Sequence, residues 1–149
     1  MRFGLILALF LVSGAAFAAA PVHYVSVKKA EAFLREGPTY QHRVLWVYKR
    51  KGYPLQVIAS YDTWRRVKDV DGAVGWINDA LLSNQRTVLV TGKGRVAIQN
   101  KDKTVAYADP GVILELKACK PAVCEVVAGS ADGWIDRTRI WGVSAGEVF

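Results

Sequence analysis

Two cysteines are the most reactive side chains in this 149-residue chain, and their spacing limits the chemistry available to them. Cys119 and Cys124 are separated by the four residues KPAV, in which Pro121 favours a turn. The only histidines, His23 and His42, lie far away in sequence, so the two thiols lack the partners that a metal site or a cysteine nucleophile needs. In an exported protein such a close pair is usually a disulfide. We therefore predict a disulfide at the neck of a hairpin and no metal site.

The remaining side chains that could support catalysis form no recognisable set. Ser60 or Ser83 could be combined with His42, but neither serine lies in a motif typical of an activated nucleophile. The carboxylates that glycoside cleavage would require, such as Asp69 and Asp71, lie in sequences typical of turns. A complete glycine-rich nucleotide loop is also missing from the sequence. We predict a protein that is not an enzyme, with no catalytic residues and no cofactor.

One tryptophan and three basic side chains lie close together in the stretch TWRRVKD at residues 63–69. Because successive strand residues point to opposite faces, an inward Val67 would place Trp64 and Arg66 on the outer face. An inward Ile77 would place Trp76 on the same partly exposed side. Tryptophans flanked by positive charge suit an anionic peptide or sugar–peptide ligand, with cation–π contact available. These residues are our first candidates for a ligand site.

A second role for the tryptophans stays open. The motif GWI at residues 75–77 recurs at 133–135, so Trp76 and Trp134 can instead cap the open ends of two similar barrels. Trp64 has no tryptophan counterpart in the second copy, where we expect Cys124, and for this residue the ligand role and the capping role are balanced. In the apolar run VLWVY at residues 44–48, we expect Trp46 to be a core residue.

Three tyrosines are further candidates for the ligand site. Tyr48 and Tyr53 bracket the basic run KRKG at residues 49–52, and Tyr40 follows a Gly-Pro turn signal. The basic run is either a solvated loop or a charged lip beside a groove. Trp141, near the C-terminus, is expected to seal the second barrel.

The elements that would position these side chains are short strands. Runs of β-branched and aromatic residues at 44–48, 55–58, 87–90 and 111–116 alternate with Gly, Pro and Asp turn signals, a spacing typical of all-β barrels or sandwiches. The repeated GWI motif divides the chain into two units, at residues 28–84 and 86–143. Units of this size bury little surface alone, so docking of one against the other and the disulfide would both help.

The N-terminus indicates export. Arg2, an apolar run and a small-residue Ala-Phe-Ala site make residues 1–19 a signal peptide rather than an uncleaved anchor, because the run is short for a membrane span. No later segment resembles a membrane helix. The formal net charge is +7, which favours anionic partners in the periplasm or outside the cell and, given export, excludes cytoplasmic nucleic acid.

The first unit resembles a bacterial SH3-like domain. The resemblance rests on FLREGPTY at 33–40, GYPLQVI at 52–58, TWRRV at 63–67 and GAVGWINDALLS at 72–83, in this order and spacing. It is closest to the exported, tandem-unit subgroup of Gram-negative bacteria. The second unit keeps the Gly-Trp and cysteine elements but has VAIQNKDK where the first has the Arg-x-Gly-Pro motif, and we regard it as degenerate.

This resemblance implies an all-β chain of two tandem small SH3-like barrels after a signal peptide, without catalytic activity. It also implies a module that binds peptidoglycan or another anionic envelope component, with the first unit providing the groove. The alternative is a scaffold subunit that docks on a periplasmic protein, and peripheral binding to anionic lipid is a third possibility.

Overall fold

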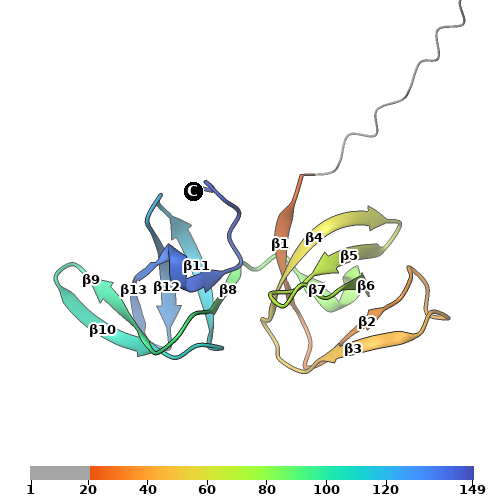
Figure 1. Cartoon of the computed structure of the whole chain (residues 1–149), viewed down its shortest axis with the longest axis horizontal. Helices are drawn as coiled ribbons and strands as arrows, with labels where there is room; N and C mark the ends of the chain where they lie inside the picture. Colours follow the sequence, from red (N-terminus) through yellow and green to blue (C-terminus); the bar gives the residue numbers. More distant parts are fainter. Residues whose placement is uncertain (1–20) are drawn as a thin grey trace, which may run out of the picture.

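The computed structural model describes residues 21–149, and the predicted signal peptide lies outside them. Within these residues there are two seven-stranded antiparallel sheets and no α-helix, so the all-β class is confirmed. Figure 1 shows the two sheets as neighbouring units joined by one short connection at residues 84–86. Residues 21–149 contain no helix of the length and apolar character that a membrane crossing requires.

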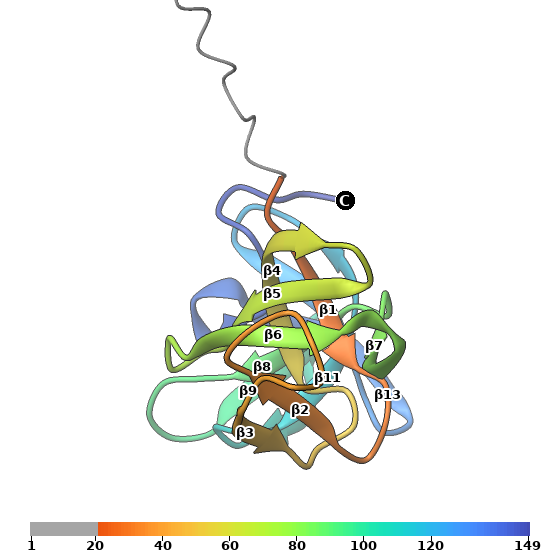
Figure 2. The same cartoon turned by 90° about the vertical axis from the view of Figure 1, so that its right-hand side faces the viewer.

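The first unit is built from seven strands and one short 3-10 turn. In chain order these are β1 (His23–Val27), β2 (Ala32–Arg35), β3 (Val44–Tyr48), β4 (Pro54–Tyr61), β5 (Trp64–Lys68), β6 (Val74–Asn78), η1 (Asp79–Leu81) and β7 (Leu82–Ser83). Their order in the sheet is β3-β2-β6-β5-β4-β1-β7. Figure 2 faces this unit and shows β6, β2 and β3 following one another across it.

The second unit repeats the same plan. It contains β8 (Thr87–Val90), β9 (Val96–Asn100), β10 (Lys103–Ala108), β11 (Ile113–Cys119), β12 (Val123–Ala128), β13 (Ala131–Asp136), η2 (Arg137–Arg139) and β14 (Ile140–Trp141). Its sheet order, β10-β9-β13-β12-β11-β8-β14, is the order of the first unit strand for strand. The pairing of β3 with β2 and the pairing of β10 with β9 each contain one register shift, at corresponding places. A residue of one unit can therefore be matched to its counterpart in the other unit through the residues with which each is paired.

Each unit has its own core of buried aliphatic side chains, which follows from the period-two alternation of its strands. Leu34, Leu55, Val67 and Ile77 are central in the first unit. In the second, Ile98, Leu114, Val126 and Ile135 take the corresponding places, together with both cysteines.

The predicted disulfide is present and lies where β11 and β12 meet. Cys119 and Cys124 are direct partners in the antiparallel register, and their sulfurs are bonded. The two residues are almost completely buried in the second core. The bond therefore links the end of one strand to the start of the next across the neck of the hairpin, as the spacing predicted.

The register corrects our alignment of the two units at Trp64. Trp64 pairs with Asn78, whereas the equivalent Asp136 pairs with Val123, so Val123 is the counterpart of Trp64. Cys124 is instead the counterpart of Arg65. The sequence comparison was wrong by one residue because the β12–β13 turn is one residue shorter than the β5–β6 turn.

Contacts between aromatic and polar side chains join the two units. The rings of Tyr24 and Trp141 meet edge to face at 5.2 Å between centroids. Thr87 donates its hydroxyl hydrogen to the carbonyl oxygen of Gly52 at 2.7 Å, and Ser26 donates to the Gln85 carbonyl at 2.8 Å. Trp141 therefore packs against the first unit, and the expectation that it would seal the second barrel was incomplete.

The glycine of each GWI motif lies where two strands approach closely. A Cβ atom built on Gly75 would lie 2.8 Å from the carbonyl oxygen of Arg35, and one on Gly133 would lie 2.9 Å from that of Gln99. Both distances are shorter than protein Cβ atoms show, and the obstacle is backbone, which cannot rotate away. The repeat of Gly before Trp thus has a packing cause that is independent of any ligand.

We expect Gly75→Ala and Gly133→Ala each to lower the free energy of unfolding by about 1–3 kcal/mol, because an added methyl group forces β2 from β6, or β9 from β13. Urea unfolding followed by tryptophan fluorescence measures the change. Ala131→Gly, in β13 but away from this approach, is the control for a general effect of substitution in the sheet. Alanine variants with the wild-type midpoint would contradict the argument.

Candidate ligand-binding groove

The edge strand β3 exposes an apolar surface that the sequence did not predict. Trp46 has 60% of its surface exposed, and Leu45 and Val44 beside it are also exposed. The expectation that Trp46 is a core residue was wrong. β3 is the outermost strand of its sheet and pairs only with β2, so an apolar run here is not covered on both faces.

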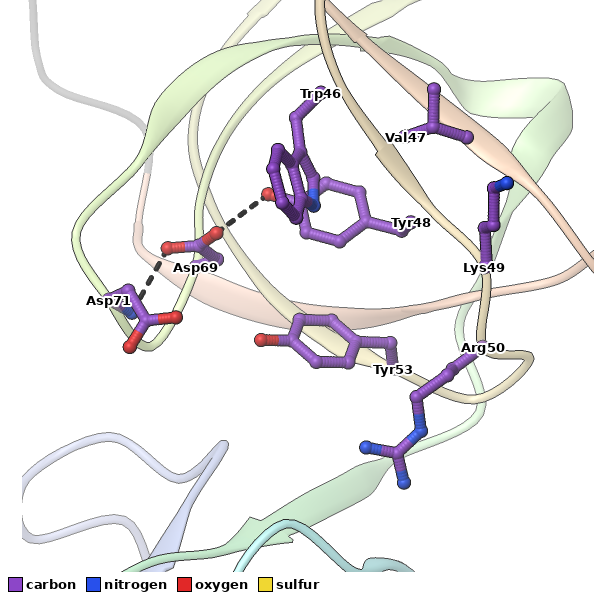
Figure 3. A pocket seen from close by; sticks show the side chains of 8 residues that line it. All are labelled: Trp46, Val47, Tyr48, Lys49, Arg50, Tyr53, Asp69 and Asp71. Carbon is purple, nitrogen blue, oxygen red and sulfur yellow. Dashed lines mark hydrogen bonds between the residues drawn. The ribbon is translucent and has the colours of Figure 1, made fainter.

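Trp46 forms one wall of a hollow of about 370 Å³. The other side chains of this hollow come from β3, from the β3–β4 loop and from the turn that follows β5. Figure 3 shows them around the opening: Trp46, Val47, Tyr48, Lys49, Arg50, Tyr53, Asp69 and Asp71. We call this the Trp46 groove.

A buried hydrogen-bond network fixes one wall of the Trp46 groove. Tyr48 donates its hydroxyl hydrogen to Asp69 at 2.9 Å, and both residues are buried. The second carboxylate oxygen of Asp69 accepts from the backbone N–H groups of Asp71, at 3.0 Å, and Ala73, at 2.9 Å. Tyr53 stacks on Tyr48 with 5.2 Å between ring centroids. Three donors thus satisfy a buried charge, which holds the turn and the aromatic wall in one position.

The charged groups of the groove are separated along its length. Figure 3 shows Asp69 and Asp71 at one end and Lys49 and Arg50 at the other, with the aromatic rings between them. Such an arrangement suits a ligand that carries a positive group at one end and a negative group at the other, with an apolar part over the rings. The KRKG run therefore contributes to the rim of this groove.

A second hollow of about 420 Å³ adjoins the first and shares Trp46, Asp69 and Asp71 with it. Leu34, Leu45 and Val74 make it more apolar than the first hollow, and Asp69 with Asp71 also line it. Trp46 thus lines both hollows, and a ligand longer than one residue can extend from one hollow to the other. This geometry is typical of grooves that bind extended peptides.

Of the six residues predicted for the ligand site, only Tyr48 and Tyr53 line the Trp46 groove. Trp64 is buried, with 6% of its surface exposed, because Tyr40 packs against its ring at 4.9 Å. The expectation that Trp64 lies on a partly exposed face was wrong, although its outward parity was right. The β2–β3 connection, which carries Tyr40, covers it.

The remaining predicted residues lie away from the groove. Arg66 is exposed and pairs with the half-buried Trp76 across β5 and β6. Tyr40 is 64% exposed and receives the Arg35 guanidinium over its ring at 5.4 Å. Arg35 itself donates to the carbonyl oxygens of Tyr40 and His42, so it organises the β2–β3 connection. Tyr40, Arg66 and Trp76 thus lie outside the groove, as does the buried Trp64.

Sequence reasoning missed Trp46, Asp69 and Asp71. Asp69 carried a usable signal, because strand parity from Val67 placed it on the inward face, where a carboxylate needs partners. Trp46 carried none, since a run such as VLWVY does not reveal that its strand is the last of a sheet.

The second unit has none of the side chains that make the groove. The counterparts of Trp46 and Tyr48, found from their partners in β2, are Ala106 and Ala108. Tyr53 and Asp69 correspond to Val112 and Ala128, which follow from the registers of β4 with β5 and of β11 with β12. The shared fold therefore does not require these aromatic and acidic groups. Within residues 21–149, no three His, Cys, Asp or Glu side chains are grouped to hold a metal ion.

We expect Tyr48→Phe to lower the free energy of unfolding by about 1–3 kcal/mol, because it leaves the buried Asp69 carboxylate without its hydroxyl donor. Tyr53→Phe is the matched control, since within the described residues its hydroxyl makes no hydrogen bond. Chemical denaturation of both variants measures the difference. Equal effects would contradict the role assigned to the Tyr48–Asp69 bond.

We also expect stability to fall as the pH rises above about 10, the ordinary tyrosine pKa. Burial raises the pKa of Tyr48, its bond to Asp69 adds to this, and burial likewise raises the pKa of Tyr53 and Tyr24. Unfolded tyrosines then lose protons that the folded ones retain, so the free energy of unfolding decreases with pH. Denaturant midpoints across this window, with tyrosinate absorbance, measure it. A smaller slope for Tyr48→Phe is expected; a flat profile for the wild type would contradict the assignment.

Comparisons with known proteins were made for the whole chain. The bacterial SH3 domain family matches residues 28–84 and 95–142. The comparison with curated proteins finds no match. Among solved structures, NlpC2 from Trichomonas vaginalis is similar over 85% of this chain and 51% of its own, with 8% identity and a TM-score of 0.38.

A second structure, NlpC1 from the same organism, is similar over 91% of this chain and 50% of its own, with 9% identity and a TM-score of 0.38. The chain thus spans about half the length of each of these proteins. At such TM-scores the two structures add nothing to the fold described above. The family match does, since its two segments include more than half of the chain and one lies in each sheet. The chain belongs to the bacterial SH3 domain family.

Proposed function

We propose that this protein is a non-enzymatic binding module of the cell envelope and that the Trp46 groove is its ligand site. The ligand class is a peptide of the cell wall, or another envelope component with the same combination of charges. Membership of a family of binding domains supports a recognition role. The single observation that carries the proposal is the exposed Trp46 that lines two adjoining hollows, the first with acidic groups at one end and basic groups at the other.

The chemistry of the groove supports a peptide that contains both amino and carboxylate groups. The exposed Asp71 can attract an ammonium group, and Lys49 and Arg50 can attract a carboxylate. Trp46 and Tyr53 offer apolar faces to the chain between them. Peptides of the bacterial wall carry free carboxylates and amines close together, which is the pattern that this groove would recognise.

The second unit supports the assignment by contrast. It keeps the same strands but has Ala106 and Ala108 where the first has Trp46 and Tyr48. A purely structural need for these aromatic residues would have applied to both units. We therefore place the ligand on the first unit and give the second a supporting role.

Export through the predicted signal peptide is part of the proposal, since only an exported protein would meet this ligand. The net charge of +7 suits an anionic wall. The periplasm and the outside of the cell are oxidising, so the Cys119–Cys124 disulfide would persist there.

We expect Trp46→Ala to weaken binding to purified sacculi at least about tenfold at moderate salt, because a central exposed tryptophan contributes strongly to recognition. Co-sedimentation measures the bound fraction. Tyr107→Ala is the matched control: Tyr107 is 58% exposed and lies on β10, which corresponds to β3 in the second unit. Trp64→Ala is unsuitable, since removal of a buried ring would destabilise the unit itself by about 3 kcal/mol or more.

Equal loss of binding in Trp46→Ala and Tyr107→Ala, or no wild-type binding, would remove the cell-wall assignment. The second candidate function then follows from the same strand. β3 is an edge strand with exposed apolar residues, which favours docking on another envelope protein by strand addition. A single stoichiometric protein partner from envelope extract that Trp46→Ala fails to recover would support that function.

A further inference from the structure

A further hollow in the first unit, distinct from the two hollows that Trp46 lines, is lined by lysines. It has a volume of about 350 Å³, and Lys28, Lys29 and Lys51 line it together with Ser83 and Gln85. No residue of this hollow lines the Trp46 groove, and no carboxylate lines it. We propose that this lysine hollow binds a compact phosphate group with two or more negative charges, such as a phosphate monoester or a diphosphate.

The three lysines come from two loops that are held side by side. Lys28 and Lys29 follow β1, and Lys51 lies in the β3–β4 loop. The Gly52 N–H donates to the Val27 carbonyl oxygen at 2.7 Å, which ties one loop to the other. The hydroxyl of Thr87 also bonds the Gly52 carbonyl, so the second unit supports the same point. The positive charges are therefore gathered by the fold rather than by chance proximity.

These ammonium groups have no neutralising partner in the part of the chain that the structure describes. The four ion pairs within residues 21–149 all use other side chains. All three lysines are exposed, so each ammonium group can turn toward a ligand. Lysine acts as a point charge, which suits a phosphate that has no fixed direction of approach.

A neutral hydrogen-bond donor completes the hollow. The Ser83 hydroxyl oxygen accepts from the Gln85 N–H at 3.1 Å, which leaves its own hydrogen available. The buried Ser26 already donates to the Gln85 carbonyl, which fixes the linker directly after Ser83. A phosphate in this hollow would thus meet three positive charges and a hydroxyl donor, and no negative group.

The second unit again differs at this place. By the registers of β1 and β8, Thr91 is the counterpart of Lys28. The guanidinium of Arg139 lies along this turn and donates to the carbonyl oxygens of Thr91 and Lys93. The second unit therefore supplies its own cation to its own turn, whereas the first leaves its lysines facing solvent.

Titration of the purified protein with inorganic pyrophosphate at physiological ionic strength, followed by amide NMR, tests the proposal. Saturable shifts are expected at residues 28–29, 51–52 and 83–85. The triple variant Lys28→Gln, Lys29→Gln and Lys51→Gln should weaken binding about tenfold, in keeping with a few partly screened ion pairs. Lys68→Gln, Lys93→Gln and Lys103→Gln remove the same charge from exposed lysines elsewhere and should change it less than about twofold.

Equal weakening in both triple variants, or the absence of saturable shifts, would overturn the proposal in favour of diffuse electrostatic attraction. Unfolding midpoints show that each variant is folded, and Lys51→Gln alone should give a partial loss if the triple variant is not. Trp46→Ala should leave pyrophosphate binding unchanged, so failure of this site and failure of the cell-wall assignment are separate results.

Vesicles distinguish the source of the phosphate. Phosphatidylcholine vesicles that contain phosphatidic acid present a phosphate monoester on a lipid, and vesicles of phosphatidylcholine alone are the control. Two results together would assign a lipid headgroup: pyrophosphate displaces the protein from the phosphatidic acid vesicles, and the triple variant of Lys28, Lys29 and Lys51 does not bind them. Binding of pyrophosphate without vesicle binding would assign a soluble phosphate.

Discussion

The contact of β6 with β2 at Gly75 determines much of what the first unit presents to its surroundings. Because no side chain separates these strands, β2 lies close enough to continue the sheet beyond β6, and β3 can pair with β2 as the outermost strand. That position exposes Trp46. It also brings Tyr48 to the turn after β5, where the Asp69 carboxylate accepts its hydroxyl hydrogen. A bulkier residue at position 75 would move the edge strand and both of its aromatic residues.

The two units show which features belong to the fold and which belong to a surface. The close glycine, the sheet order and the register shift in the outermost strand pair occur in both units. The aromatic residues of β3, the buried Asp69 and the lysines around the junction occur only in the first. The second unit has alanine or valine at the positions that correspond to Trp46, Tyr48, Tyr53 and Asp69, and it has a disulfide in its core. The duplicated frame has thus kept two different surfaces, and only the first has the charges and rings of a ligand site.

The sequence was sufficient for the class of fold, the two-unit organisation and the disulfide, because each depends on local signals: turn residues, strand alternation and the Cys119–Cys124 spacing. The site was recovered only in part. The alternation of side chains along a strand predicts toward which face of the sheet each one points, but it does not predict what covers that face. Trp64 begins outward and is buried under Tyr40, whereas Trp46 belongs to an apolar run and is exposed because no strand follows β3. Both outcomes depend on long-range packing that no short window of sequence records.

The relation between the two units is fixed by Arg86, which lies just before β8. Its guanidinium lies over the rings of Tyr24 and Phe149 and pairs with Glu147 at 2.7 Å. The hydrogen bonds from Arg86 lower the pKa of Glu147, so this pairing is present at neutral pH and is lost as the pH falls through the lowered pKa of that carboxyl. One side chain thus holds β1, the C-terminal segment and the linker together. Thr87 at the same junction bonds the Gly52 carbonyl, so the second unit also helps to orient the loop that carries Lys51 and Gly52.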